Sequence, residues 1–163
     1  MSLFADSRYQ WRETYFVLFQ DQHRPPAADV EKALADLGSK VAVEDVIGDE
    51  DGLIESLTIF AHADSAGMDI TYVEGDEVQE QVVELRREWK NLMQSDGERA
   101  VLGRLQSCNA RLDVFHFEEL GDGFLDEAAD EGVLDPATLL LVLSRLAKLC
   151  HGTAVDPQSG PLI

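Results

Sequence analysis

Two histidines stand two residues before a carboxylate in stretches with strand-like sequence. His62 precedes Asp64, and His116 precedes Glu118. Side chains two residues apart project from the same face of a strand. Imidazole and carboxylate groups together bind divalent metals and also act as acid and base partners. If the two strands are neighbours, these four residues form a candidate metal site of a hydrolase, but the sequence leaves open whether they are.

Other enzyme signatures are missing from the sequence. No Gly-x-Ser-x-Gly, Walker or Gly-x-Gly-x-x-Gly pattern occurs. The acidic run 49–52 has Ile47 and Thr58 where an EF-hand places its first and twelfth ligands, which excludes a calcium loop there. Cys150 adjoins His151 at the end of a predicted helix, where neighbouring side chains point about 100° apart. No cofactor is expected.

Aromatic residues near the N-terminus form the second candidate site. Tyr9, Trp11 and Tyr15 have the spacing that places side chains on one face of a strand. Aromatic side chains of this kind are enriched at protein interfaces. We predict that these three residues contact a protein partner, while the same pattern also describes aromatic residues that cover a core.

The charge of the chain narrows the class of partner. The 32 Asp and Glu residues against 13 Lys and Arg give a net charge of -19. This charge repels phosphate backbones and anionic lipids, so nucleic-acid binding and membrane docking are disfavoured. It attracts basic proteins, and the acidic segment 118–131 is a candidate contact for one. High net charge also keeps a protein soluble, so a purely solubilising role stays open.

The composition predicts one domain over residues 1–163. A chain of 163 residues with 45% hydrophobic content buries a core without disulfides or metals. The longest apolar run, 137–143, falls short of the roughly 20 residues that a membrane span needs, and no secretory signal is recognisable. Cys108 and Cys150 have no Cys-x-x-Cys spacing, which is typical of reduced thiols. The predicted location is the cytoplasm.

Hydrophobic periodicity predicts an α+β fold. The expected strands cover 14–19, 40–47, 53–63, 68–73, 111–118 and 153–155. The expected helices cover 25–37, 76–93, 98–107 and 136–150, with a short surface helix within 121–131. Two strand-helix-strand crossings beside antiparallel pairs predict a mixed, mainly antiparallel sheet with helices packed on one face.

This order of elements resembles a ferredoxin-like sandwich with an added C-terminal helix and strand. The resemblance is architectural and assigns no function. Sheets of this kind often dimerise and bind effectors between subunits, so a homodimer and a small-molecule sensor are compatible with it. The main prediction is a non-catalytic binding or regulatory protein with an acidic surface that engages a basic protein, and the alternative is the metal-assisted hydrolase.

Overall fold

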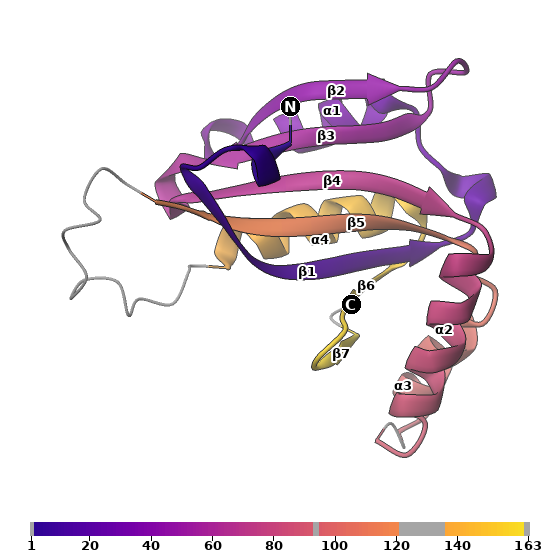
Figure 1. Cartoon of the computed structure of the whole chain (residues 1–163). Coiled ribbons are helices and arrows are strands. Elements are labelled where there is room, and N and C mark those ends of the chain that lie inside the picture. Colours follow the sequence, from indigo (N-terminus) through magenta and orange to yellow (C-terminus); the bar gives the residue numbers. More distant parts are fainter. Residues whose placement is uncertain (1, 93–94, 121–135, 162–163) are drawn as a thin grey trace, which may run out of the picture.

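A seven-stranded antiparallel sheet forms the centre of the molecule in the computed structural model, which describes residues 2–92, 95–120 and 136–161 (Figure 1). The strand order is β2-β3-β4-β5-β1-β6-β7. The strands are β1 (Tyr9–Phe19), β2 (Ala42–Gly48), β3 (Ile54–Ala61), β4 (Ala66–Glu74), β5 (Ala110–Glu119), β6 (Thr153–Asp156) and β7 (Gly160–Pro161). The α-helices are α1 (Ala27–Ala35), α2 (Asp76–Trp89), α3 (Asp96–Leu105) and α4 (Ala137–Cys150). Four short 3-10 turns are η1 (Leu3–Ala5), η2 (Asp21–His23), η3 (Gly38–Lys40) and η4 (His62–Asp64).

The α+β class is confirmed, but the predicted topology is wrong in one crossing. Strands β4 and β5 are direct antiparallel neighbours, and every strand pair among the described residues is antiparallel, so the sheet is not mixed. Helices α2 and α3 form a hairpin beyond the end of the sheet and do not cross its face (Figure 1). Gly75 turns the chain out of β4 at a φ of +103°, and its N–H bonds Asn109 O at 2.9 Å. The ferredoxin-like order is therefore not confirmed.

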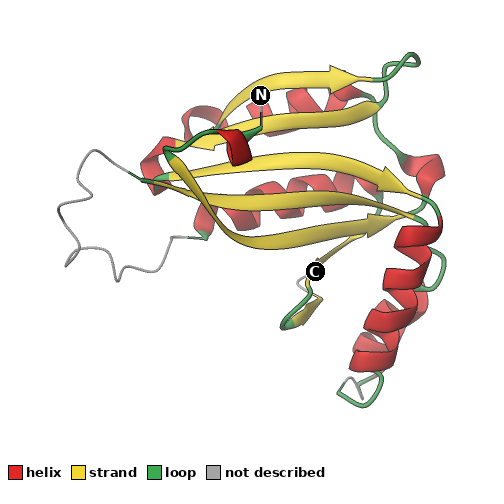
Figure 2. Ribbon diagram, in the orientation of Figure 1, coloured by secondary structure: helices red, strands yellow, loops and turns green. Residues whose placement is uncertain are grey.

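Helices α1 and α4 cover one face of the sheet, which we call the covered face (Figure 2). Residues at alternate positions of each strand point into this core because strand side chains alternate between the two faces. The strands contribute Tyr15, Val17, Phe19, Leu57, Ile59, Met68, Ile70, Leu112 and Val114, and the helices contribute Val30, Leu34, Leu139, Val142, Leu143 and Leu146.

The opposite side of the sheet, which we call the open face, is covered only in part. The α2–α3 hairpin packs against one end of it, where Leu18 and Val155 meet apolar residues of both helices. The turn η1 lies over β4, and a Cβ at Gly67 would approach Leu3 Cδ1 to 2.8 Å. Buried Asp69 holds this turn in place, since it accepts the Leu3 N–H at 2.8 Å. None of the helices in the described ranges is long and apolar enough to cross a membrane.

Candidate functional site

A bulge in β1 separates the three aromatic residues that the sequence placed together. The pairing of β1 with β5 shifts its register between Trp11 and Glu13. An extra residue in one strand reverses the alternation of its side chains. Tyr9 and Trp11 therefore lie on the open face, whereas Tyr15 is buried in the core of the covered face. The prediction that all three share one face is wrong for Tyr15.

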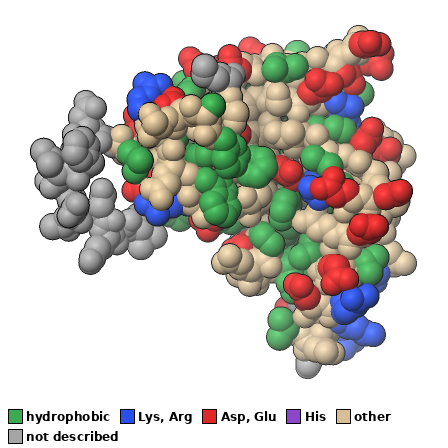
Figure 3. All heavy atoms as spheres, in the orientation of Figure 1, with side chains coloured by type: hydrophobic (Ala, Val, Ile, Leu, Met, Phe, Trp, Pro, Cys, Tyr) green, Lys and Arg blue, Asp and Glu red, His purple; other side chains and the backbone are tan. Residues whose placement is uncertain are grey.

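Trp11 belongs to a group of aromatic residues on the open face that we call the aromatic patch. Its members are Phe4, Trp11, Phe60, Phe115 and Phe117. The Phe4 ring meets the rings of Phe117 and Phe115 edge-on, at centroid distances of 4.7 and 5.2 Å. Phe4 is 59% exposed and Trp11 is 48% exposed. Figure 3 shows hydrophobic side chains gathered on this face, and exposed apolar groups in a cluster mark interaction sites more often than isolated ones do.

Sequence reasoning missed Phe4. A single phenylalanine in an N-terminal tail gives no periodic signal, so nothing in the pattern places it on the sheet. Its position depends on η1, where Ser2 Oγ and the Leu3 N–H both donate to Asp69 at 2.8 Å. Thr58 Oγ1 donates to the other oxygen of the same carboxylate at 2.9 Å. This contact between residues more than 60 positions apart appears only in the folded chain.

A shallow hollow of about 230 Å³ lies across β3 and β4, between Ser2, which caps η1, and the sheet edge at β2. Its lining includes Ser2, Asp45, Ile47, Ser56, Thr58, Asp69 and Thr71. The edge strand β2 is exposed along most of its length, and Ile47 is 50% exposed. The hollow is therefore a mainly polar surface with one apolar edge.

Strands β3 and β4 separate beyond this hollow, and Arg24 occupies the space between them. The last paired residues are Ser56 and Thr71. Arg24 donates to the Ile54 carbonyl at 2.9 and 2.7 Å and lies 3.9 Å from the centroid of the Tyr72 ring. These contacts give the Ile54 carbonyl a partner at a point where β3 no longer pairs with β4, although Ile54 still pairs with Gly48 of β2.

Five carboxylates surround this end of the sheet, and we call them the acidic end. They are Asp49, Glu50, Asp51, Glu55 and Glu74. They line two hollows of about 490 and 420 Å³ that share Glu55. The second of these also shares Ser56 and Thr71 with the shallow hollow. Arg24 is the one basic residue that lines either hollow among the described residues, and it pairs with Asp49 at 3.1 Å.

The shallow hollow thus reaches the turn that carries Phe4 through Ser2, and it reaches the acidic end through Ser56 and Thr71. Together we call the aromatic patch, the shallow hollow and the acidic end the interaction surface. Asp and Glu side chains gather near the β2–β3 turn in Figure 3, at the end of the sheet away from the aromatic patch. The acidic segment 121–131, which the sequence also predicted as a short helix and a partner contact, lies outside the described residues.

Two of the four predicted metal ligands, His62 and Glu118, make separate ion pairs. His62 is exposed, its ring stacks on Phe60 with a centroid distance of 5.5 Å, and its Nδ1 lies 3.4 Å from Glu119 Oε2. Glu118 instead accepts hydrogen bonds from the guanidinium of Arg12. The carboxylate beside His62 is therefore Glu119, which the sequence analysis did not select.

The other two predicted ligands lie apart, with Asp64 at the start of α4 and His116 on the covered face. Asp64 Oδ2 accepts the Thr138 N–H at 3.2 Å and so caps the first turn of α4. His116 is 1% exposed, and its Nδ1 lies 3.9 Å from Glu13 Oε1. Neither ring nitrogen has a hydrogen-bond partner among the described residues. Burial lowers the pKa of His116, and the negative charge of Glu13 opposes this effect.

The four candidate ligands therefore have four different partners. No group of three or more His, Cys, Asp or Glu residues in the described part of the chain is placed to hold a metal ion. No protein family matches the chain, and no curated protein or solved structure gives a match. Its function has to be argued from the geometry of its surface.

Proposed function

We propose that this chain is a non-catalytic binding protein that engages a basic protein partner through the interaction surface. One observation carries the proposal: exposed aromatic side chains on the open face and a cluster of carboxylates at one end of the sheet lie on either side of the shallow hollow. Such a surface supplies both apolar contact area and charge complementarity. No observation in the described residues favours the metal-assisted hydrolase.

The aromatic patch supplies the apolar contacts of the proposed complex. Phe4 and Trp11 keep about half of their side-chain surface in water. Covering them with a partner removes apolar area from water, which is the main favourable contribution to association. Large aromatic residues near the centre of an interface commonly contribute most of its binding energy. We therefore expect the partner to place an apolar or aromatic residue against Trp11.

The acidic end supplies the preference for a basic partner. Glu50, Asp51 and Glu55 are exposed and make no ion pair with another described residue, so their charge is free to act on a partner. Opposite charges increase the rate of encounter and disfavour partners of the wrong sign. A second copy of this chain would bring two acidic ends together, so a heterologous basic protein fits the surface better than a homodimer does.

A selection from a displayed library of random peptides tests the proposal, since it needs no known partner. The target is the full chain, with counter-selection against the variant Glu50→Gln, Glu55→Gln, Glu74→Gln. We expect the selected peptides to be rich in Lys and Arg and to carry at least one aromatic or large aliphatic residue. Their affinity is expected to fall about tenfold in the variant and to fall further between about 0.05 and 0.5 M salt.

A matched variant controls for the total charge. Glu31→Gln, Asp36→Asn, Glu88→Gln removes the same number of negative charges from exposed positions outside the interaction surface. This variant should bind the selected peptides as the parent chain does. Selection of neutral or acidic peptides, failure of any peptide to be enriched, or an equal loss of affinity in both variants would contradict the proposal.

A further inference from the structure

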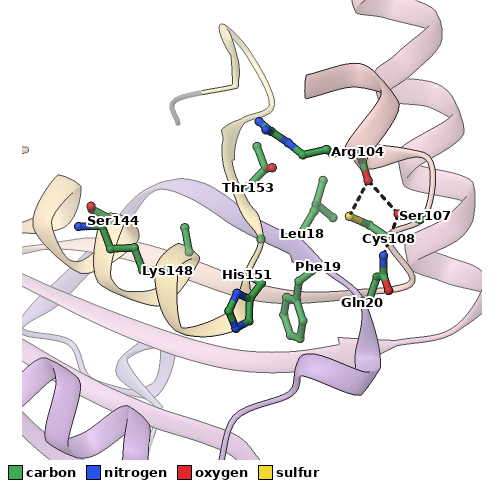
Figure 4. Close-up of a pocket in the computed structure, with 12 residues that line it drawn as sticks. Leu18, Phe19, Gln20, Arg104, Ser107, Cys108, Ser144, Lys148, His151 and Thr153 are labelled. Carbon is green, nitrogen blue, oxygen red and sulfur yellow. Dashed lines mark hydrogen bonds between the residues drawn. The ribbon is translucent and has the colours of Figure 1, made fainter. Parts of the chain in front are cut away.

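A hollow of about 570 Å³ lies outside the interaction surface, between the C-terminal ends of α3 and α4 (Figure 4). It is larger than any of the three hollows of the interaction surface and shares no lining residue with them. Its volume lies within the roughly 300–1,000 Å³ that is common for small-molecule sites. The hollow is therefore a candidate ligand site that is independent of the proposed function.

The charge of this hollow is opposite to that of the whole molecule. Its 12 lining residues include Arg104, Lys148 and His151 but no carboxylate, although 32 of the 163 residues are Asp or Glu. Each hollow of the interaction surface is lined by at least two carboxylates. The side chains of Arg104 and Lys148 have no hydrogen bond or ion pair with other described residues. Their charges are thus available to a ligand.

The positions of these two cations at helix ends explain why they are stable without a carboxylate. Arg104 lies in the last turn of α3, and Lys148 lies in the last turn of α4. A helix C-terminus carries a partial negative charge equivalent to about half an elementary charge, which favours cations in the last turn. Each side chain carries a full positive charge, so the charge of the two cations is larger than the opposing partial charge of the two helix ends.

The remaining walls supply hydroxyl groups and apolar surface. Ser107 and Ser144 lie on opposite sides, and Figure 4 shows Thr153 between them and the Phe19 ring beside His151. Ser107 is already oriented, since Gln20 Nε2 donates to its Oγ at 3.0 Å. A ligand with two separated anionic groups would therefore find a cation on each side of the hollow.

Gly152 fixes the distance between two walls of the hollow. A Cβ at this position would lie 2.4 Å from the Leu18 carbonyl oxygen, so a side chain would push the end of α4 away from β1. The Gly152 N–H also bonds Ala147 O at 2.9 Å and closes the last turn of α4. The hollow is thus shaped by packing within the fold and not by a loose loop.

We infer that this hollow binds a small organic anion with at least two anionic groups, one held by Arg104 on one wall and another by Lys148 on the other wall. Hydrogen bonds between ionised groups are roughly twice as strong as those between neutral groups, so the two cations would contribute most of the affinity. The Ser144 hydroxyl would help to orient the group near Lys148. No covalent step is involved.

Titration with three probes tests this inference: inorganic phosphate, citrate and adenosine monophosphate. The amide signals of Gly152 and Thr153 in ¹H–¹⁵N spectra report binding. We expect saturable shifts of these signals, and we expect citrate to bind more tightly than inorganic phosphate because only citrate carries several separated anionic groups that can reach both cations. The variant Arg104→Gln, Lys148→Gln should bind about tenfold more weakly.

The variant Lys32→Gln, Lys40→Gln is the matched control, since it removes two exposed cations from a different part of the molecule. It should bind the best probe as the parent chain does, and thermal unfolding should show that both variants are folded. The inference is overturned if no probe gives saturable shifts at about 0.15 M salt. It is also overturned if phosphate binds as well as citrate, or if both variants lose affinity equally.

Discussion

The two faces of the sheet are built from different chemistry. The covered face packs aliphatic side chains of β1, β3, β4 and β5 against α1 and α4, and most of them are fully buried. The open face carries half-exposed aromatic rings together with buried polar residues such as Asp69 and Arg111. The first arrangement stabilises the fold through burial. The second leaves apolar and charged groups in contact with water, where they are accessible to a partner.

The polar residues of the open face hold its surroundings in place. Arg111 donates to Asp113 at 2.6 Å, to Gln81 at 2.6 Å and to Glu77 at 3.2 Å, and so connects β5 to α2. Burial raises the pKa of Asp113, and the charge of Arg111 opposes this effect. Buried ion pairs of this kind add little net stability but lose much when one partner is removed. The open face thus depends on specific contacts more than on buried area.

The largest expected effect is the loss of packing on the covered face. Leu143→Ala should lower the free energy of unfolding by about 2–5 kcal/mol, since Leu143 is fully buried and its truncation leaves a cavity. Urea unfolding measures the change. Leu140→Ala on the same helix is the control, because Leu140 is 46% exposed, and it should cost less than about 0.5 kcal/mol. Equal losses in the two variants would contradict the assignment of α4 to the core.

Removal of the Asp69 carboxylate should have the next largest effect. Asp69→Ala leaves the Leu3 N–H and the Thr58 hydroxyl without their acceptor, at an expected cost of about 1–3 kcal/mol. The turn η1 should then detach from the open face. Faster hydrogen exchange of the Leu3 amide reports this, and Asp69→Asn, which keeps one acceptor oxygen, should have a smaller effect. Unchanged exchange in Asp69→Ala would show that η1 is held by other contacts.

His116 should make stability depend on pH. Burial lowers its folded-state pKa below the ordinary value of 6.5, so the unfolded chain binds a proton first as the pH falls. The contribution of neutral His116 to the free energy of unfolding is fully present above pH 6.5. It is lost below that pH, at up to about 1.4 kcal/mol per pH unit, until the folded-state pKa is reached.

Unfolding of the parent chain and of His116→Leu between pH 7 and about 5.5 measures this contribution. The variant should show the shallower dependence on pH. Leu140→Ala is the control, since it removes an exposed side chain that does not titrate, and it should retain the slope of the parent chain. An equal slope in His116→Leu and the parent chain would contradict the account of this buried histidine.

The smallest effect on stability is expected at the aromatic patch. Trp11→Ala loses one hydrogen bond, from Nε1 to Thr14 Oγ1 at 3.0 Å, and exposed contacts. It should lower the free energy of unfolding by less than about 1 kcal/mol. Its affinity for the selected basic peptides should nevertheless fall at least about tenfold. A large loss of stability without loss of binding would reverse the roles that we assign to the two faces.

The sequence predicted most helices and strands because their periodicity is local. The expected strand 68–73 and helix 136–150 differ from β4 and α4 by one or two residues at their ends. The adjacency of β4 and β5 could not be predicted in this way, because a helical pattern does not show whether a helix crosses a sheet or folds back on a second helix. The expected strand 14–19 likewise began too late, since β1 starts at Tyr9.

The candidate sites were predicted less well than the elements. The bulge after Trp11 places Tyr15 on the opposite face from Tyr9 and Trp11, and no residue type at that position predicts a bulge. The hollow between α3 and α4 brings together Arg104 and Lys148, which are far apart in the sequence and look like ordinary last-turn cations. Each of these features depends on tertiary contacts, so periodicity alone does not contain it.

The most direct test of the central claim is a ¹H–¹⁵N titration of the full chain with one of the selected basic peptides. The account predicts shifts at Phe4, Trp11, Ser56 and Thr71, which belong to the interaction surface, and few shifts in α1 and α4. Shifts that concentrate on α1 and α4, or that spread evenly over exposed carboxylates on both sides of the sheet, would contradict the assignment of recognition to the open face.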